Sequence, residues 1–210
     1  MKRRHFIAAA ALGLAVGSSG TQAATPASIL VVGDSLSAEY GLARGTGWVA
    51  LLEKRLAAEK ISATVHNASI SGDTTSGGRA RLAPLLSSVK PSLVVIELGG
   101  NDALRGLPLQ STEDNLRQMT EAAQKAGAKV LLVGMQVPPN YGREYAERFS
   151  GLFAKVAKGE KTGLVPFLLK GVADAPDPVQ LFQPDRIHPK AEAHPTLLNN
   201  VWPELKKLLK

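Results

Sequence analysis

The stretch Ile29-Leu30-Val31-Val32-Gly33-Asp34-Ser35-Leu36 joins an unbroken apolar run to a Gly-Asp turn. A short apolar run that ends in turn-forming residues is typical of a buried strand. The turn would hold the Ser35 hydroxyl at the carboxyl end of that strand, where open α/β sheets bind their ligands. Ser35 is therefore a candidate nucleophile, although a serine in a turn more commonly bonds nearby backbone N–H groups.

Four further apolar runs follow, and stretches with helical spacing separate them. The runs predict strands at 64–67, 93–98, 130–133 and 164–169, and the last stretch predicts a helix from Leu197 to Leu208. Strand and helix thus alternate five times, which is typical of a parallel sheet covered on both faces. We therefore expect one α/β domain, a three-layer α/β/α sandwich around a five-stranded sheet.

The composition of the strands predicts their order in the sheet. The runs that begin at 29, 93 and 130 are continuously apolar, as expected of strands buried on both faces. Residues 64–67 are mixed, and 164–169 contains Pro166, which an edge strand tolerates. The second and fifth strands are then the edges, which gives the flavodoxin-like order 2-1-3-4-5.

The helix between the third and fourth strands carries its own boundary signals. Ser111 and Asp114 have the spacing of a capping box, and Gly127 is a candidate stop.

Polar residues follow three other predicted strands at the edge where Ser35 would lie. Gly72 follows the second strand, Asn101 follows the third, and Asp185-x-x-His188 stands in the loop after the fifth. Acyl transfer needs a serine to attack, a histidine to take its proton, a carboxylate to hold the imidazole, and donors such as the Gly72 N–H and the Asn101 amide for an oxyanion. Each residue alone has an ordinary role in a turn or cap, but together they favour a catalytic site.

Four blocks of the chain carry a resemblance to a known family. Gly33-Asp34-Ser35-Leu36, Gly72, Gly99-x-Asn101-Asp102 and Asp185-x-x-His188 resemble the sequence blocks of the SGNH hydrolases, also called GDSL esterases/lipases. The similarity covers nearly the whole chain after the first 24 residues. The strings 67–73, 97–106 and 138–143 resemble the branch of acyl-CoA thioesterase/lysophospholipases and arylesterases.

The resemblance implies cofactor-free hydrolysis of carboxylic esters and thioesters through an acyl-enzyme on Ser35. It implies that His188 is the general base, that Asp185 is its partner, and that the Ser35 N–H joins Gly72 and Asn101 in the oxyanion hole. Two positions depart from the pattern of the branch: Arg186 stands where a small residue is usual, and Glu39 where glycine is common. We expect both to affect substrate preference more than activity.

The loops after the third and fourth strands supply candidate walls for an acyl groove. These apolar residues are Leu107, Pro108, Val137, Pro138 and Tyr141. Ordinary loop packing explains them nearly as well.

The first 24 residues have the layout of a cleaved secretory signal peptide. Lys2-Arg3-Arg4 precede an apolar stretch that is too short to span a bilayer comfortably, and small residues follow. We expect a mature domain of residues 25–210 in the periplasm or outside the cell, exported by either the general secretory or the twin-arginine route. We expect no stable membrane insertion after cleavage, and a monomer.

Charge and composition limit the partners. Cleavage removes three positive charges and no negative one, so the formal net charge of +7 becomes +4. The basic residues are scattered, which argues against nucleic acid as a partner. Because the chain has no cysteine, disulfides and cysteine nucleophiles are excluded.

Several other functions compete with a small-molecule esterase. A carbohydrate acetylesterase of the same fold and a non-catalytic periplasmic binding protein are the main alternatives. Weaker patterns suggest a dinucleotide site at Gly45-x-Gly47-x-x-Ala50, a glycosidase pair at Glu97 and Asp102, and a metal set of His188, Glu192 and His194. We expect no metal, and we expect Glu97 to need a buried partner because it lies in a central strand.

Overall fold

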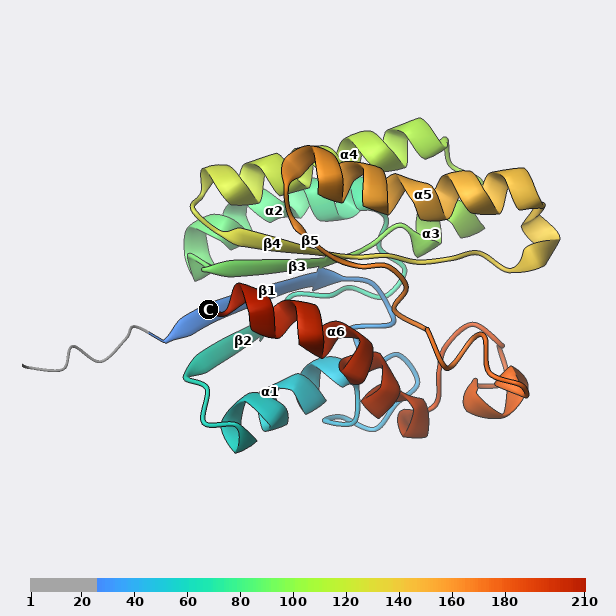
Figure 1. The fold of residues 1–210 in the computed structure, drawn as a ribbon, viewed down its shortest axis with the longest axis horizontal. Coiled ribbons are helices and arrows are strands. Elements are labelled where there is room, and N and C mark those ends of the chain that lie inside the picture. The colour runs from blue at the N-terminus through green and yellow to red at the C-terminus, as the bar shows by residue number, and fades with distance from the viewer. Residues whose placement is uncertain (1–25) are drawn as a thin grey trace, which may run out of the picture.

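The computed structural model describes residues 26–210, so the predicted signal peptide lies outside the described residues. Five strands form one parallel sheet in the order β2-β1-β3-β4-β5 (Figure 1). They are β1 (Ala27–Gly33), β2 (Ala63–Asn67), β3 (Leu93–Glu97), β4 (Lys129–Val133) and β5 (Gly163–Val165). The predicted strand order is therefore confirmed.

Helices cover both faces of the sheet and make the three layers that the alternation predicts. On one face α1 packs against α6, and on the other α4 packs against both α2 and α5 (Figure 1). The short α3 follows β3 directly. The helices are α1 (Trp48–Ala58), α2 (Thr75–Val89), α3 (Gly100–Leu104), α4 (Leu109–Lys125), α5 (Arg143–Glu160) and α6 (His194–Leu208), with 3-10 turns η1 (Pro139–Tyr141), η2 (Pro178–Leu181) and η3 (Ala191–Ala193).

The central strands form the middle of the hydrophobic core. Residues 29–32 of β1 and 93–96 of β3 are buried, and so are residues 130–133 of β4. These strands lie between two helical layers, so neither face can carry polar side chains at low cost. By contrast, β2 is only partly buried, as expected of an edge.

Several element boundaries differ from the sequence prediction, and two of the differences have a clear local cause. β5 ends at Val165, so Pro166 lies just outside the strand. Since Pro166 has no N–H, it cannot extend the ladder. The predicted capping box of α4 is wrong, because that helix begins at Leu109 after Pro108 and Ser111 lies inside its first turn. Gly127 does follow the end of α4, with a φ of 88°.

None of the helices formed by residues 26–210 combines the length and the apolar character needed to cross a membrane.

Candidate active site

Ser35 stands in the turn that follows β1, at the carboxyl edge of the sheet. The backbone N–H groups of Ser37 and Ala38 donate to the Asp34 carbonyl, which closes the turn, and the Leu36 N–H donates to Asp34 Oδ1 at 3.0 Å. The Ser35 side chain is left partly exposed beyond the end of the strand. The Ser35 hydroxyl takes no part in these hydrogen bonds and is left for a partner from another segment.

The hydroxyl meets His188 from the loop that precedes α6. Ser35 Oγ lies 2.8 Å from His188 Nε2, and His188 Nδ1 lies 2.7 Å from Asp185 Oδ2. Asp185 Oδ1 accepts the backbone N–H groups of Ile187 and His188, so the carboxylate also shapes the loop. The structure therefore brings these three predicted residues into one chain of hydrogen bonds.

Electrostatics favour one proton arrangement in this chain. Burial raises the pKa of Asp185, but the N–H groups of His188 and Ile187 and the nearby imidazole outweigh it and lower that pKa to about 2. The ionised carboxylate thus accepts a hydrogen bond from a protonated Nδ1 of His188. The other ring nitrogen, Nε2, is then free to accept the Ser35 hydroxyl proton.

The predicted oxyanion donors lie beside the same turn. Asn101, in the first turn of α3, donates from Nδ2 to Asp34 Oδ2 at 3.0 Å. The Ile70 N–H donates to the Gly33 carbonyl at 3.0 Å, which holds the loop that carries Gly72 against the end of β1. Gly72 has a φ of 79°, a conformation that favours glycine. Within residues 26–210, neither the Ser35 nor the Gly72 N–H donates to another group.

Arg105 supports the Gly72 loop from the end of α3. Its guanidinium donates to the Gly72 carbonyl at 2.7 Å. Nothing in the sequence pattern relates these two residues.

Tyr40 is a second neighbour of the site that the sequence analysis does not predict. Its half-exposed ring lies over the His188 imidazole, with the ring centroids 4.4 Å apart. Gln183 donates to the carbonyls of Tyr40 and Pro189, so it ties the serine segment to the histidine loop. These contacts join segments that are far apart in the chain, so no pattern of residue spacing in the sequence predicts them.

Glu97 has the buried partner that its strand position predicts. Ser37 Oγ donates to Glu97 Oε2 at 2.7 Å, and Trp48 Nε1 donates to Ser37 Oγ at 3.2 Å. A side chain at Gly33 would place its Cβ 2.7 Å from Ser37 Oγ, so the network needs glycine there. Burial raises the pKa of Glu97 well above its usual value, and the Asp34 charge raises it further.

The carboxyls of the suggested glycosidase pair are both turned into the protein. Glu97 and Asp102 are each 2% exposed. Asp102 accepts the Thr75 backbone N–H and hydroxyl and the Thr112 hydroxyl. Because both carboxyls are enclosed and hydrogen-bonded, the glycosidase interpretation is wrong.

The dinucleotide-like glycine pattern also has another use. The Glu39 carboxylate accepts hydrogen bonds from the N–H groups of Gly45 and Gly47. A bound phosphate would need these same N–H groups as donors. Glu39 itself has a φ of 60°, and Arg186 has a φ of 59°. Both departures from the family pattern therefore occupy left-handed backbone, which glycine adopts with less strain because it has no Cβ.

The suggested metal set has other partners as well. His188 faces Ser35 and Asp185, whereas His194 Nδ1 accepts the Trp48 backbone N–H at 3.0 Å. Across residues 26–210, no group of three or more candidate ligands could hold a metal ion.

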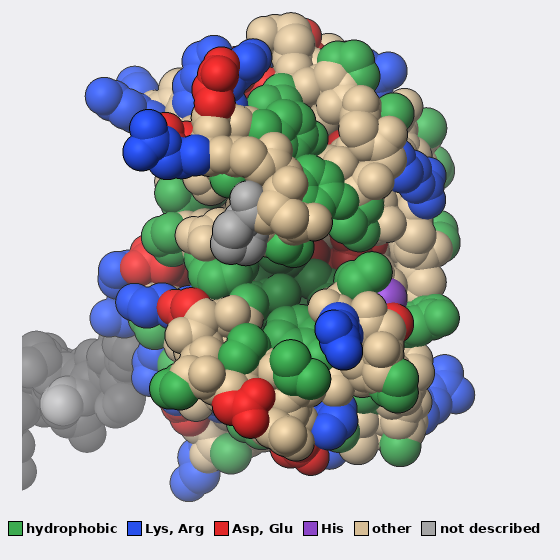
Figure 2. All heavy atoms as spheres, turned by 90° about the vertical axis from the view of Figure 1, so that its right-hand side faces the viewer, with side chains coloured by type: hydrophobic (Ala, Val, Ile, Leu, Met, Phe, Trp, Pro, Cys, Tyr) green, Lys and Arg blue, Asp and Glu red, His purple; other side chains and the backbone are tan. Residues whose placement is uncertain are grey.

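The predicted acyl-groove residues come from two separate loops. Leu107 and Pro108 line a hollow of about 460 Å³ beside α2 and α4. Val137, Pro138 and Tyr141 follow β4, where the Tyr141 ring stacks on Tyr145. Figure 2 shows the carboxyl edge of the sheet as a hollowed face in which hydrophobic side chains gather. The groove itself stays a prediction.

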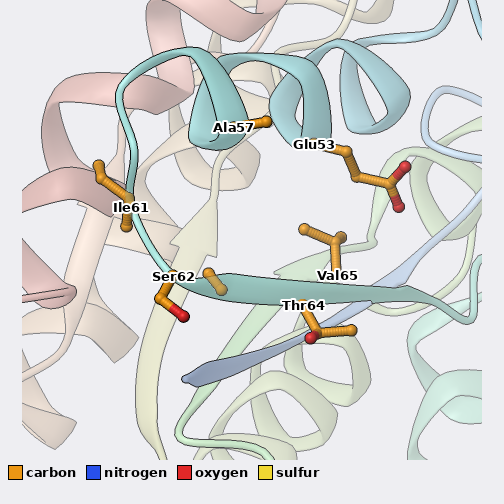
Figure 3. Close-up of a pocket in the computed structure, with 7 residues that line it drawn as sticks. Glu53, Ala57, Ile61, Ser62, Thr64 and Val65 are labelled. Carbon is orange, nitrogen blue, oxygen red and sulfur yellow. The ribbon is translucent and has the colours of Figure 1, made fainter. Parts of the chain in front are cut away.

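A second hollow, of about 380 Å³, lies away from this edge. It is formed by Ile61 and Ser62 just before β2, by Thr64 and Val65 of β2, and by Glu53 and Ala57 of α1 (Figure 3). Because these residues lie near the amino ends of the strands, the hollow is remote from Ser35.

Comparison with known proteins places the chain among acylhydrolases. Residues 31–195 match the GDSL-like lipase/acylhydrolase family. The chain is 56% identical over 189 residues to the esterase TesA of Pseudomonas aeruginosa, which covers 90% of this chain and 92% of the relative. It is 41% identical over 188 residues to the thioesterase 1/protease 1/lysophospholipase L1 of Escherichia coli K12, with 90% and 88% covered.

The crystal structure of TesA supports the same placement. It is 56% identical in sequence and matches the fold with a TM-score of 0.83, over 86% of this chain and 99% of that chain.

Proposed function

Because the chain belongs to the GDSL-like lipase/acylhydrolase family and is an esterase, we propose that it cleaves carboxylic esters and thioesters through an acyl-enzyme on Ser35. The observation that carries this proposal is the hydrogen-bond chain from Asp185 through His188 to Ser35. Such a chain activates a hydroxyl that is otherwise a weak nucleophile.

The first half of the reaction acylates the enzyme. Ser35 Oγ attacks the acyl carbonyl carbon while His188 Nε2 takes the hydroxyl proton. The carbonyl oxygen becomes an oxyanion, and the imidazolium is stabilised by the Asp185 carboxylate. When the intermediate collapses, the bond to the leaving oxygen or sulfur breaks and His188 returns the proton to it.

The second half releases the acid. A water molecule takes the place of the leaving group, His188 takes a proton from it, and the resulting hydroxide attacks the acyl carbon. Collapse of this second intermediate breaks the bond to Ser35 Oγ, which recovers its proton from His188.

The oxyanion is negative in both halves and needs donors that are already in place. We assign this role to the N–H groups of Ser35 and Gly72 and to the Asn101 side-chain amide. The two backbone N–H groups carry no other hydrogen bond within residues 26–210. Donors fixed before the reaction cost no reorganisation when the charge develops.

The substrate is proposed from the relatives and the surface together. The matched relatives bear the names esterase and thioesterase/lysophospholipase, which supports acyl esters and thioesters as the substrate class. We propose that Leu107, Pro108, Val137, Pro138 and Tyr141 contact the acyl chain. We further propose that residues 1–24 are a signal peptide, that the mature chain acts as a monomer in the periplasm or outside the cell, and that it needs no cofactor.

Hydrolysis assays on the mature chain test this function. The substrates are p-nitrophenyl acetate, butyrate and longer esters, together with palmitoyl-CoA and a lysophospholipid. Ser35→Ala should lower kcat by on the order of 10⁶-fold, by analogy with other serine hydrolases. Ser62→Ala, at the remote hollow, is the matched serine control and should retain full activity.

Two results would contradict the proposal. A folded Ser35→Ala enzyme with normal turnover would remove Ser35 as the nucleophile. A wild-type protein that cleaves none of these substrates would favour a carbohydrate acetylesterase or a binding protein instead.

A further inference from the structure

We propose that Asp34 is a positioning residue that fixes the Asn101 amide with its nitrogen toward the oxyanion. This role rests on the function proposed above. Asp34 itself touches no substrate, since the residue is only 3% exposed beneath the turn.

The Asp34 carboxylate is held in one orientation by two different donors. Its Oδ1 accepts the Leu36 backbone N–H and its Oδ2 accepts Asn101 Nδ2, both at 3.0 Å. The first bond belongs to the turn that carries Ser35, and the second reaches α3. The turn that places the nucleophile therefore also places the acceptor for the Asn101 amide.

The acceptor decides which end of the amide faces the site. The oxygen and nitrogen ends of an asparagine have nearly the same shape, so hydrogen bonding must select between them. An ionised carboxylate can only accept, and it therefore selects the NH₂ end. One Asn101 N–H is used by Asp34, and the second remains to meet the oxyanion.

The selection requires Asp34 to be ionised during catalysis. Burial raises the pKa of Asp34 to about 6, against the lowering effects of the Leu36 N–H, the His188 charge and the Asn101 amide. Asp73 lies near enough to raise it slightly, whereas Glu97 is more fully enclosed and has its own pKa raised further. At neutral pH the negative charge of this buried pair therefore resides on Asp34.

Asp34→Asn separates this role from the support of the turn. The oxygen of the introduced amide can still accept the Leu36 N–H, but its NH₂ group then faces Asn101. Two NH₂ groups cannot satisfy each other, so the Asn101 amide turns and presents its oxygen where the donor stood. The variant should keep the fold and lose the oxyanion donor.

A double-mutant cycle on p-nitrophenyl butyrate measures the effect. Asn101→Ala should lower kcat roughly 100- to 1,000-fold, as in other oxyanion holes. Asp34→Asn should lower kcat to a similar degree with little change in KM, and the double variant should be no slower than Asn101→Ala alone. Such non-additivity is expected of two residues that act as one unit.

Ser37→Ala is the matched control within the same turn. It removes the hydrogen bond to Glu97 and should lower the Tm, but it leaves Asp34 and Asn101 in contact, so kcat should stay near the wild-type value. If Asp34→Asn does not fold, Asp34→Ser replaces it, because a serine is too short to reach Asn101 and should give the same loss of kcat.

The outcomes distinguish this inference from the proposed function. Normal kcat in folded Asp34→Asn, or losses that simply add in the double variant, would overturn the role of Asp34 while Ser35-dependent hydrolysis stands. If wild type and Ser35→Ala behave alike, the proposed function fails and the role of Asp34 fails with it.

Discussion

The Glu97 carboxyl shows how a single buried polar residue can support a site without reaching it. It ends β3 beneath the serine turn and accepts hydrogen bonds from the Ser37 hydroxyl and, at 3.4 Å, from the Asp34 backbone N–H. An ionised carboxylate is costly in such surroundings, so the proton is retained. The residue thus stabilises the segment that carries the turn, by an amount that depends on pH.

We predict that Glu97→Gln removes that pH dependence. The pKa of Glu97 is ~4.3 in the unfolded chain and is raised in the folded protein. As the pH rises above ~4.3, the unfolded chain releases this proton while the folded protein keeps it, so wild-type stability falls. A glutamine keeps the acceptor but does not titrate. In denaturant unfolding between about pH 5 and pH 8, the variant should gain stability relative to wild type as pH rises.

Glu53→Gln, on the exposed face of α1, is the control for this experiment. It should follow the wild-type pH dependence. A constant difference between Glu97→Gln and wild type at every pH would contradict the burial argument.

At the scale of elements, α1 begins without a cap from its own chain segment. Its N-cap residue, Gly47, offers no side chain, and its first N–H groups are bonded instead by Glu39 and by His194 of α6. Since α1 and α6 also pack together on one face of the sheet, the histidine joins the start of both helices. Sequence patterns of local capping cannot reveal such a partner.

We predict that this contact weakens in acid. Burial lowers the pKa of His194, partly offset by the Pro189 carbonyl and the Glu39 charge. In the unfolded chain the histidine pKa is ~6.5, so below that pH the unfolded chain binds a proton that folded His194 does not bind. The free energy of unfolding therefore falls as the pH drops below ~6.5. His194→Asn keeps an acceptor for the Trp48 N–H without titrating, so its Tm should depend less on pH between about pH 5 and pH 7.

His66→Asn, at an exposed position in β2, is the matched control and should retain the wild-type slope. An unchanged slope in His194→Asn would show that other groups set the acid sensitivity.

Across the whole molecule, apolar periodicity predicted the sheet because burial on both faces leaves a strong signal in β1, β3 and β4. Boundaries were less predictable, as the early start of α4 and the early end of β5 show, because a helix or strand end depends on a few local hydrogen bonds. Because the loops that follow parallel strands meet at one edge of the sheet, residues such as His188 could be proposed for the active site from the sequence. The orientations of Asp34 and Tyr40 depend on tertiary contacts that no spacing encodes.

The proposed mechanism depends above all on a covalent intermediate at Ser35, and this intermediate can be trapped. The mature protein is treated with an alkyl p-nitrophenyl phosphonate, digested and examined by mass spectrometry, with Ser35→Ala and Ser62→Ala treated alongside. We predict one phosphonyl group per chain on the peptide that contains Ser35, in wild type and Ser62→Ala alike, and none in Ser35→Ala. A phosphonyl group on another residue, or equal labelling of Ser35→Ala, would show that Ser35 is not the nucleophile.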